Sequence, residues 1–342
     1  MQENSAGIMK KIAPEQTEEI FRRANIILNV HDSEPVGRRN LAKLLNMPER
    51  KVRSSSDAMI KLGLLSAGPA GMKTTKVARA LLPGLRKIYN VTEQTLTSES
   101  RLSQMLNVER VIIASGDSDN GPDALGHMCS VAAKILQTYL KPDMVIAIAG
   151  GTTMAKLAKS MEPAWPSIVV VPARGGIGSQ LSTQADSIAG EMAKSLRSQG
   201  RLMHLPDELD MTALKELEKL PSIKEVLELI SMADILLLGI GRADKMARRR
   251  GLLQPQIETL LSLGAVGESA GHFFNMEGHT VYQSPSVGAH VGLPRNGGKI
   301  ISVAGGLSKA EAIIGAVRHH KPDVLVTDTG AAQAMEEILS KA

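Results

Sequence analysis

The stretch Asp143-Met-Val-Ile-Ala-Ile-Ala-Gly-Gly-Thr-Thr153 decides the fold of this chain. Its apolar run, rich in Val and Ile, is typical of a strand buried on both faces. Two glycines and two threonines follow, and residues 154–160 then continue with helical spacing. The stretch therefore predicts a strand, a tight turn and a helix in succession.

The turn at Gly150, Gly151, Thr152 and Thr153 has two interpretations. Glycines let a ligand approach the backbone, and the start of a helix offers N–H groups and a positive dipole end, which suits a phosphate or carboxylate. Alternatively, the residues form only a strand-to-helix turn with threonine as the N-cap. These four residues alone do not separate the two interpretations.

Length and composition indicate two or three domains, because 342 residues are enough for several cores. The single cysteine, Cys129, excludes an intrachain disulfide. No apolar segment resembles a signal peptide or a membrane span, so we expect a cytoplasmic protein with no membrane partner. The histidines lack metal-ligand spacing, and we expect neither a metal site nor a cofactor.

Positive charge is concentrated at the N-terminal end. Residues 1–90 hold 16 Lys and Arg against 8 Asp and Glu, whereas the rest of the chain holds 24 against 27. A basic head on a nearly neutral body suggests that the head binds a polyanion. A solvated basic surface is the alternative, and charge alone does not decide between them.

The N-terminal residues predict a winged helix-turn-helix domain over 14–88. Pro14 and the acids after it begin a helix, since proline and acidic residues belong in a first turn. A short helix over 38–45, a tight turn, a helix over 49–62 and a hairpin over 64–74 follow. This is the order of elements in the winged helix-turn-helix motif.

The third helix would enter the major groove, which makes its N-terminal side chains candidates for base and phosphate contacts. The second helix would begin near the DNA backbone, and the hairpin would be the wing. The DNA-binding candidates are Arg38, Arg39, Arg50, Lys51, Arg53, Ser54, Ser55 and Lys73. A helical protein-interaction module with exposed arginines is the alternative.

The remaining chain predicts a linker and a large α/β domain. We expect a helix over 75–90 broken at Pro83, a linker helix over 89–108, and an effector domain over 109–342. In that domain strands alternate with helices, which indicates a mostly parallel, Rossmann-like sheet covered on both faces. The expected strands are 111–114, 143–149, 167–171, 201–204, 234–241, 299–304 and 323–327, with an irregular region after residue 266.

Four glycine-rich segments follow these strands, at 150–153, 172–178, 239–241 and 305–309. The carboxyl ends of parallel strands meet at one edge, where ligands of such sheets bind. Arg174 and Lys309 add cations, so the convergence predicts a site for an anionic small molecule. Each segment could also be a plain turn. No G-x-G-x-x-G with a suitably placed acid and no Walker lysine motif is present, which excludes the usual nucleotide sites.

Taken together, these motifs resemble those of the SorC family of bacterial sugar-responsive transcription regulators. The resemblance covers nearly the whole chain and rests on residues 34–39, 150–153, 172–176, 184–185, 239–241, 246–250, 266–268, 303–306 and 309–311. It implies an effector domain similar to sugar-phosphate isomerases and glucosamine-phosphate deaminases. It also implies a repressor of glycolytic genes, not an enzyme, that a sugar phosphate releases from DNA, with fructose 1,6-bisphosphate as the expected effector.

The resemblance also implies roles for individual residues. One phosphate pocket would comprise Gly150, Gly151, Thr152, Thr153, Arg174, Gly175, Gly176 and Lys309. The sugar and a second phosphate would be bound by Gln184, Arg249 and Glu268, with Arg250 as the alternative to Arg249. The chain departs from the family pattern at Asp186, Ser269 and Ala270. Asp186 beside a phosphate would be unfavourable, so it points away or the ligand preference differs.

A second class of function stays open at this stage, namely a sugar-phosphate isomerase or deaminase with an accessory DNA-binding domain. The loop over 239–244 lacks the Asp-Gly-His run typical of the deaminases. Glu268 and His272 could still support a weak activity. We also expect a homo-oligomer, either a dimer or a tetramer, because one winged helix buries too little surface for a specific operator.

Overall fold

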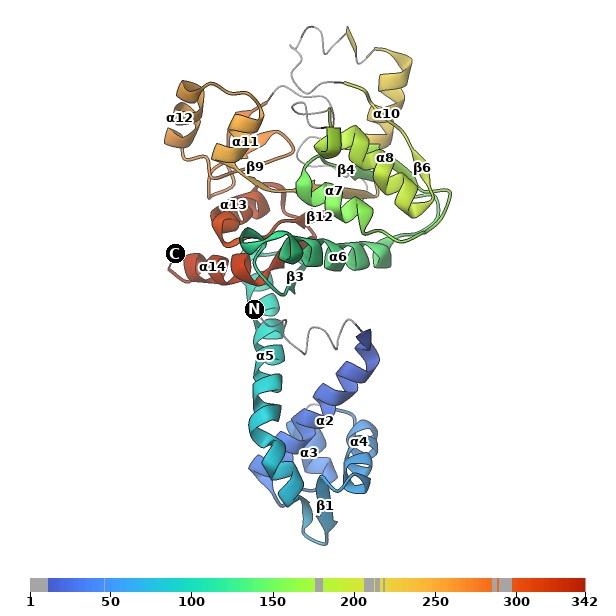
Figure 1. Ribbon diagram of the computed structural model, residues 1–342, viewed down its shortest axis with the longest axis vertical. Helices are drawn as coiled ribbons and strands as arrows, with labels where there is room; N and C mark the ends of the chain where they lie inside the picture. Colours follow the sequence, from blue (N-terminus) through green and yellow to red (C-terminus); the bar gives the residue numbers. More distant parts are fainter. Residues whose placement is uncertain are drawn as a thin grey trace. The chain divides into compact units, whose positions relative to one another are not determined.

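The computed structural model describes residues 12–45, 47–175, 181–205, 212, 216, 217, 219–284, 288 and 297–341, without the side chains of 14 and 86–97. The chain divides into two compact units, Met1–Thr97 and Ser98–Ala342. Figure 1 draws the first in blue to cyan and the second in cyan through red. No helix in the described ranges is both long and apolar enough to cross a membrane.

From Pro14 onward, the described part of the first unit contains three helices, a two-stranded hairpin and the start of a long helix, as predicted for a winged helix-turn-helix. Its elements are α2 (Pro14–Ser33), α3 (Arg38–Leu44), α4 (Glu49–Lys61), β1 (Leu65–Gly68), β2 (Gly71–Thr74) and α5 (Lys76–Leu106). Ile26 of α2, Leu41 of α3 and Met59 of α4 are fully buried together with Leu65 and Met72 of the hairpin. Apolar side chains at helical spacing thus build one small core under the wing.

The wing is attached to the loop between α2 and α3. Val36 exchanges two backbone hydrogen bonds with Met72, at 3.1 and 2.9 Å. The Glu34 carboxylate accepts hydrogen bonds from the Thr74 backbone N–H at 2.6 Å and the Thr74 hydroxyl at 2.9 Å, and pairs with Arg79 at 2.7 Å. The bond from the Thr74 backbone is the main reason that the pKa of Glu34 is lowered.

The expected break at Pro83 is wrong. Helix α5 runs without interruption through Pro83 over all 31 of its residues. A proline removes one backbone hydrogen bond from a helix interior. In a helix of this length the remaining bonds preserve the helix on both sides of it.

The second unit is built on a seven-stranded sheet in which every neighbouring pair is parallel, as predicted. The order is β3-β13-β12-β7-β4-β5-β6. The strands are β3 (Arg110–Ala114), β4 (Val145–Ile148), β5 (Val169–Pro172), β6 (Gln199–Gly200), β7 (Ile235–Gly239), β12 (Lys299–Val303) and β13 (Val324–Asp328). One predicted strand is misplaced: we expected a strand over 201–204, whereas the structure has β6 just before it, at Gln199–Gly200.

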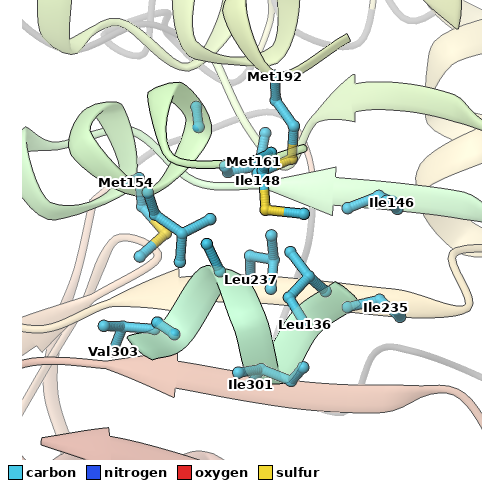
Figure 2. Close-up of a cluster of buried hydrophobic side chains, with 14 of the residues drawn as sticks. Leu136, Ile146, Ile148, Met154, Met161, Met192, Ile235, Leu237, Ile301 and Val303 are labelled. Atoms are coloured by element: carbon cyan, nitrogen blue, oxygen red, sulfur yellow. The ribbon is translucent and has the colours of Figure 1, made fainter. Parts of the chain in front are cut away.

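Helices cover both faces of this sheet. One face is covered by α6 (Pro122–Tyr139), α7 (Thr152–Lys159) and α8 (Ala185–Leu196). The other is covered by α10 (Pro221–Ser231), α13 (Ala310–His320), α14 (Thr329–Leu339) and the end of α5. Figure 2 shows the first face, where Ile146 and Leu237 gather with Leu136 of α6, Met154 of α7 and Met192 of α8. Alternate residues of β4 and β7 enter the opposite core, which explains their uninterrupted apolar sequence.

The region expected to be irregular forms a small antiparallel sheet instead, in the order β11-β10-β9-β8. Its strands are β8 (Gly241–Arg242), β9 (Gly267–Ser269), β10 (His272–Phe274) and β11 (Thr280–Gln283), with α11 (Ala243–Arg249) and α12 (Gln254–Ser262) beside them. Strands of two to four residues are too short to show a period in the sequence. Their pairing places Glu268 opposite Gly241 and Phe273.

We expect Glu34→Gln to destabilise the winged unit by about 1–3 kcal/mol at pH 7, because the neutral amide has one acceptor oxygen where the carboxylate has two. The bonds from Thr74 and from Arg79, which end on different oxygens, cannot then all be kept. The lowered pKa of Glu34 sets the pH dependence. Its contribution is complete above the unfolded-state pKa and disappears as the pH falls through the folded-state pKa. Urea unfolding followed by circular dichroism measures the effect.

The matched control is Glu18→Gln, which makes the same change at an exposed position of α2. The role of the Glu34 charge would be contradicted if the difference in unfolding free energy between the wild type and Glu34→Gln stayed constant between pH 7 and about pH 3.

Candidate functional site

A cavity lies at the carboxyl ends of the central strands β4 and β7. These two strands are neighbours, while β5 continues on the side of β4 and β12 on the side of β7. The chain therefore reverses its direction of winding between them, which is where open α/β sheets bind ligands. The cavity measures about 140 Å³. Its lining residues are Ala149, Gly150, Gly151, Thr152, Thr153, Arg174, Gly175, Thr183, Ala185, Gly239, Ile240, Gly241, Met246, Arg249, Glu268, Ala270 and Lys309.

Gly150 and Gly151 meet two different requirements of the turn after β4. A Cβ on Gly150 would lie 2.9 Å from the carbonyl oxygen of Thr183, so the close approach of the backbones excludes a side chain. Gly151 has a φ of +119° and is the N-cap of α7. Its N–H donates to the same Thr183 carbonyl at 3.0 Å. Helix α7 thus begins at the cavity wall with Thr152 and Thr153, and directs its positive dipole end there.

Besides Arg174, which follows β5, two further cations line the cavity and start from other strand ends. Arg249 closes α11, after β7, and its guanidinium donates to the Thr183 hydroxyl. Lys309 follows β12 and is half-buried. Burial lowers the pKa of Lys309, although the nearby carboxylates of Asp119 and Asp328 oppose this effect.

A buried ion triplet forms another part of the cavity wall. The Glu268 carboxylate lies 2.6 Å from a guanidinium nitrogen of Arg250 and 3.6 Å from one of Arg174. It also accepts the backbone N–H of Gly271 at 2.6 Å. A Cβ on Gly271 would strike the Arg174 guanidinium, so this hairpin glycine makes room for the arginine.

The loop after β3 holds the Lys309 segment in place. Asp119 accepts the N–H of Ser308 at 2.7 Å and its hydroxyl at 3.2 Å, and Asp117 accepts the N–H of Leu307 at 3.2 Å. The fully buried Asp328 accepts the N–H of Gly306 at 3.1 Å. Three carboxylates thus fix the backbone that carries Lys309, a role that the sequence analysis did not assign to them.

Most of the predicted ligand residues meet at this cavity. Nine of them line it: Gly150, Gly151, Thr152, Thr153, Arg174, Gly175, Arg249, Glu268 and Lys309. Gln184 and Arg250 are not among its lining residues, and Gly176 lies outside the described residues. Within the run of three arginines, Arg249 is therefore the one that reaches the cavity.

Thr183 is the main residue that the sequence analysis missed. Its carbonyl accepts from Gly151 and its hydroxyl from Arg249, so it joins two parts of the cavity wall. The only signal in the sequence was its position directly before the Gln184-Ala185 pair.

For Asp186 we expected either that it points away from the cavity or that the ligand preference differs. Its carboxylate accepts the N–H groups of Met203 and His204 at 2.8 and 2.9 Å, so Asp186 points away from the cavity.

The predicted DNA-contacting side chains are mostly exposed. The side chains of Arg39 and Arg53 are 86% and 61% exposed, and both pair with Glu49. Arg50, Lys51, Ser54 and Lys73 are exposed as well. Arg38 is half-buried and binds Asp57 of α4.

Ser55 requires a correction. It is only 3% exposed, because it lies with Val52, Ser56 and Met59 on the buried face of α4. Residues three and four positions apart share one face of a helix, so the burial of Val52 and Met59 turns Ser55 inward as well. We therefore omit Ser55 from the DNA-contacting surface.

Two family models match the chain. "Putative sugar-binding domain" covers residues 91–336, and "CggR N-terminal DNA binding domain" covers residues 20–89. Together they account for both units of the structure.

Individual relatives are similar over almost the full chain. The central glycolytic genes regulator of Priestia megaterium is 34% identical over 331 residues, which are 96% of this chain and 97% of the relative. The protein of the same name from Bacillus subtilis is 33% identical over 95% of this chain and 96% of its own. A crystal structure described as a "putative SorC family transcriptional regulator" from Enterococcus faecalis superposes with a TM-score of 0.66 at 35% identity, over 70% of this chain and 99% of that one.

If a phosphorylated sugar such as fructose 1,6-bisphosphate occupies the cavity, Arg249→Met should weaken its binding by about 2–5 kcal/mol, because a phosphate would lose a charged partner inside a partly dry cavity. Arg248→Met is the matched control. Its side chain is 58% exposed and pairs with Asp244, so affinity should not change. Calorimetry of both variants measures the difference, and equal losses in the two would show that only general positive charge is involved.

We expect Arg53→Ala to reduce the preference for operator over random DNA by about 1–3 kcal/mol if Arg53 contacts a base. Lys61→Ala, at the exposed far end of α4, should leave that preference unchanged. Fluorescence anisotropy with both DNAs measures it. Equal losses on both DNAs would place Arg53 on a phosphate, and unchanged binding to both would contradict the assignment of α4.

Proposed function

This chain belongs to the SorC family of transcriptional regulators, and from that premise we propose that it represses glycolytic genes and is released from its operator by fructose 1,6-bisphosphate. The winged unit would bind the operator through the exposed cations of α3, α4 and the wing. The second unit would bind the sugar phosphate. The protein would act in the cytoplasm, where both the DNA and the sugar phosphate are found.

The observation that carries the choice of effector is that cations of the cavity come from different strand ends. Arg249 follows β7 and Lys309 follows β12, and the positive end of α7 lies at the cavity wall as well. A phosphate group requires several charge-assisted hydrogen bonds. Cations from two strand ends suit a ligand with a phosphate at each end better than a monophosphate.

The relatives are transcriptional regulators, not enzymes, and the same is true of this chain. Among the described residues that line the cavity, Glu268 is the one carboxylate, and two guanidinium groups engage it. His272, which the enzyme alternative would also need, is 8% exposed and is not a lining residue.

We further propose that the regulator binds DNA as a homo-oligomer. A single winged helix buries a small surface on DNA, and operator specificity at cellular salt normally requires two half-sites. A symmetric dimer or a tetramer of this chain would provide them.

The test is an operator gel-shift titrated with fructose 1,6-bisphosphate. We expect the ligand to release the wild-type protein, and Lys309→Met to need at least about thirtyfold more ligand while binding the free operator normally. Lys224→Met, an exposed substitution on α10, is the matched control and should respond like the wild type. Operator binding that does not respond to any concentration of the ligand would overturn the proposed effector.

A further inference from the structure

We propose that Arg250 is a positioning residue that controls how much positive charge the cavity presents to an anionic ligand, although it does not itself line the cavity. It would do so by pairing with Glu268, so that this carboxylate neutralises less of the positive charge of Arg174. The proposal rests on the anion-binding role proposed above, and it extends that role to a residue behind the cavity wall.

The geometry of the ion triplet is unequal. The Arg250 guanidinium lies 2.6 Å from the Glu268 carboxylate, whereas that of Arg174 lies 3.6 Å from the same oxygen. All three side chains are at most 5% exposed. Glu268 and Arg174 line the cavity, and Arg250 does not. The shorter contact therefore lies on the side away from the ligand.

Charge balance explains the consequence of this arrangement. Two arginines and one glutamate carry one net positive charge, and water does not screen it at this depth. A buried carboxylate that loses a charged partner is strongly destabilised, which favours closer pairing with another cation nearby. Without Arg250, Glu268 has Arg174 as its charged neighbour within the triplet. Arg174 would then neutralise Glu268 instead of a ligand phosphate.

Helix α11, which ends just before Arg250, connects this triplet with Arg249, another cation of the cavity. Helix α11 ends at Arg249, which faces the cavity, and Arg250 is its C-cap, with its N–H bonded to the Met246 carbonyl at 3.0 Å. Its guanidinium lies 6.0 Å from the centre of the fully buried Phe273 ring. Adjacent helical residues point about 100° apart, so one helix end sends one arginine to the ligand and the next to Glu268.

The test compares variants by the net charge of the triplet, with inorganic phosphate as the probe in calorimetry. Arg250→Met leaves no net charge, and phosphate binding should weaken by roughly tenfold or more. Glu268→Gln leaves two positive charges and should strengthen it. The double variant restores one positive charge and should return to within about threefold of the wild type. Inorganic phosphate makes no sugar contacts, so the loss of a sugar-binding carboxylate does not affect this comparison.

Arg250→Lys is the conservative variant. It keeps the charge but loses the planar fork, so it should retain phosphate binding even where thermal unfolding shows some loss of stability. Unchanged phosphate binding in Arg250→Met would overturn the proposal. So would a double variant that is folded by circular dichroism yet binds phosphate no better than Arg250→Met, because that result would indicate a purely structural role.

The operator experiment separates this proposal from the proposed function. If phosphate affinity follows the charge order but fructose 1,6-bisphosphate does not release the operator, the proposed function fails and the role of Arg250 stands. If the wild type binds neither ligand, both fail.

Discussion

The central strands of the seven-stranded sheet, such as β4 and β7, are buried on both faces, and the position of the cavity depends on this constraint. Val145 and Ala147 of β4 pack into one core, while Ile146 and Ile148 pack into the other. A strand of this kind requires helices on both sides, and so requires crossover connections that keep the strands parallel. Parallel strands bring their carboxyl ends to one edge, and the reversal between β4 and β7 leaves an opening there.

The cavity wall combines backbone segments that approach each other closely with a buried ion triplet of Glu268, Arg174 and Arg250. Gly150 permits the contact with Thr183, and Gly271 permits the contact with Arg174. Carboxylates hold two of the cation-bearing segments: Glu268 contacts Arg174, and Asp119 binds the loop of Lys309. Such pairing limits the positive charge that the cavity could present to an anionic ligand.

The winged unit uses a different arrangement to hold its functional surface. Its core is small, and the wing is attached through the backbone pairing of Val36 with Met72 and through the carboxylate of Glu34. Burial of Val52 and Met59 orients α4 so that Arg50 and Arg53 are exposed. The same packing removes Ser55 from the surface, which illustrates that the DNA-contacting face is decided by the core behind it.

The sequence by itself determined the features that depend on local patterns. These are the apolar strands, the glycine turns after them, the order of the winged elements and the separation of Arg174 from Lys309 along the chain. Tertiary packing alone decided which of three consecutive arginines faces the cavity, that Thr183 joins Gly151 to Arg249, and that Ser55 is buried. It also produced the four-stranded antiparallel sheet, whose strands are too short to carry a period. The physical reason is the distance along the chain over which each effect acts. Hydrophobic periodicity and turn chemistry depend on residues close together in the sequence, whereas side-chain direction and charge pairing depend on elements far apart in the chain.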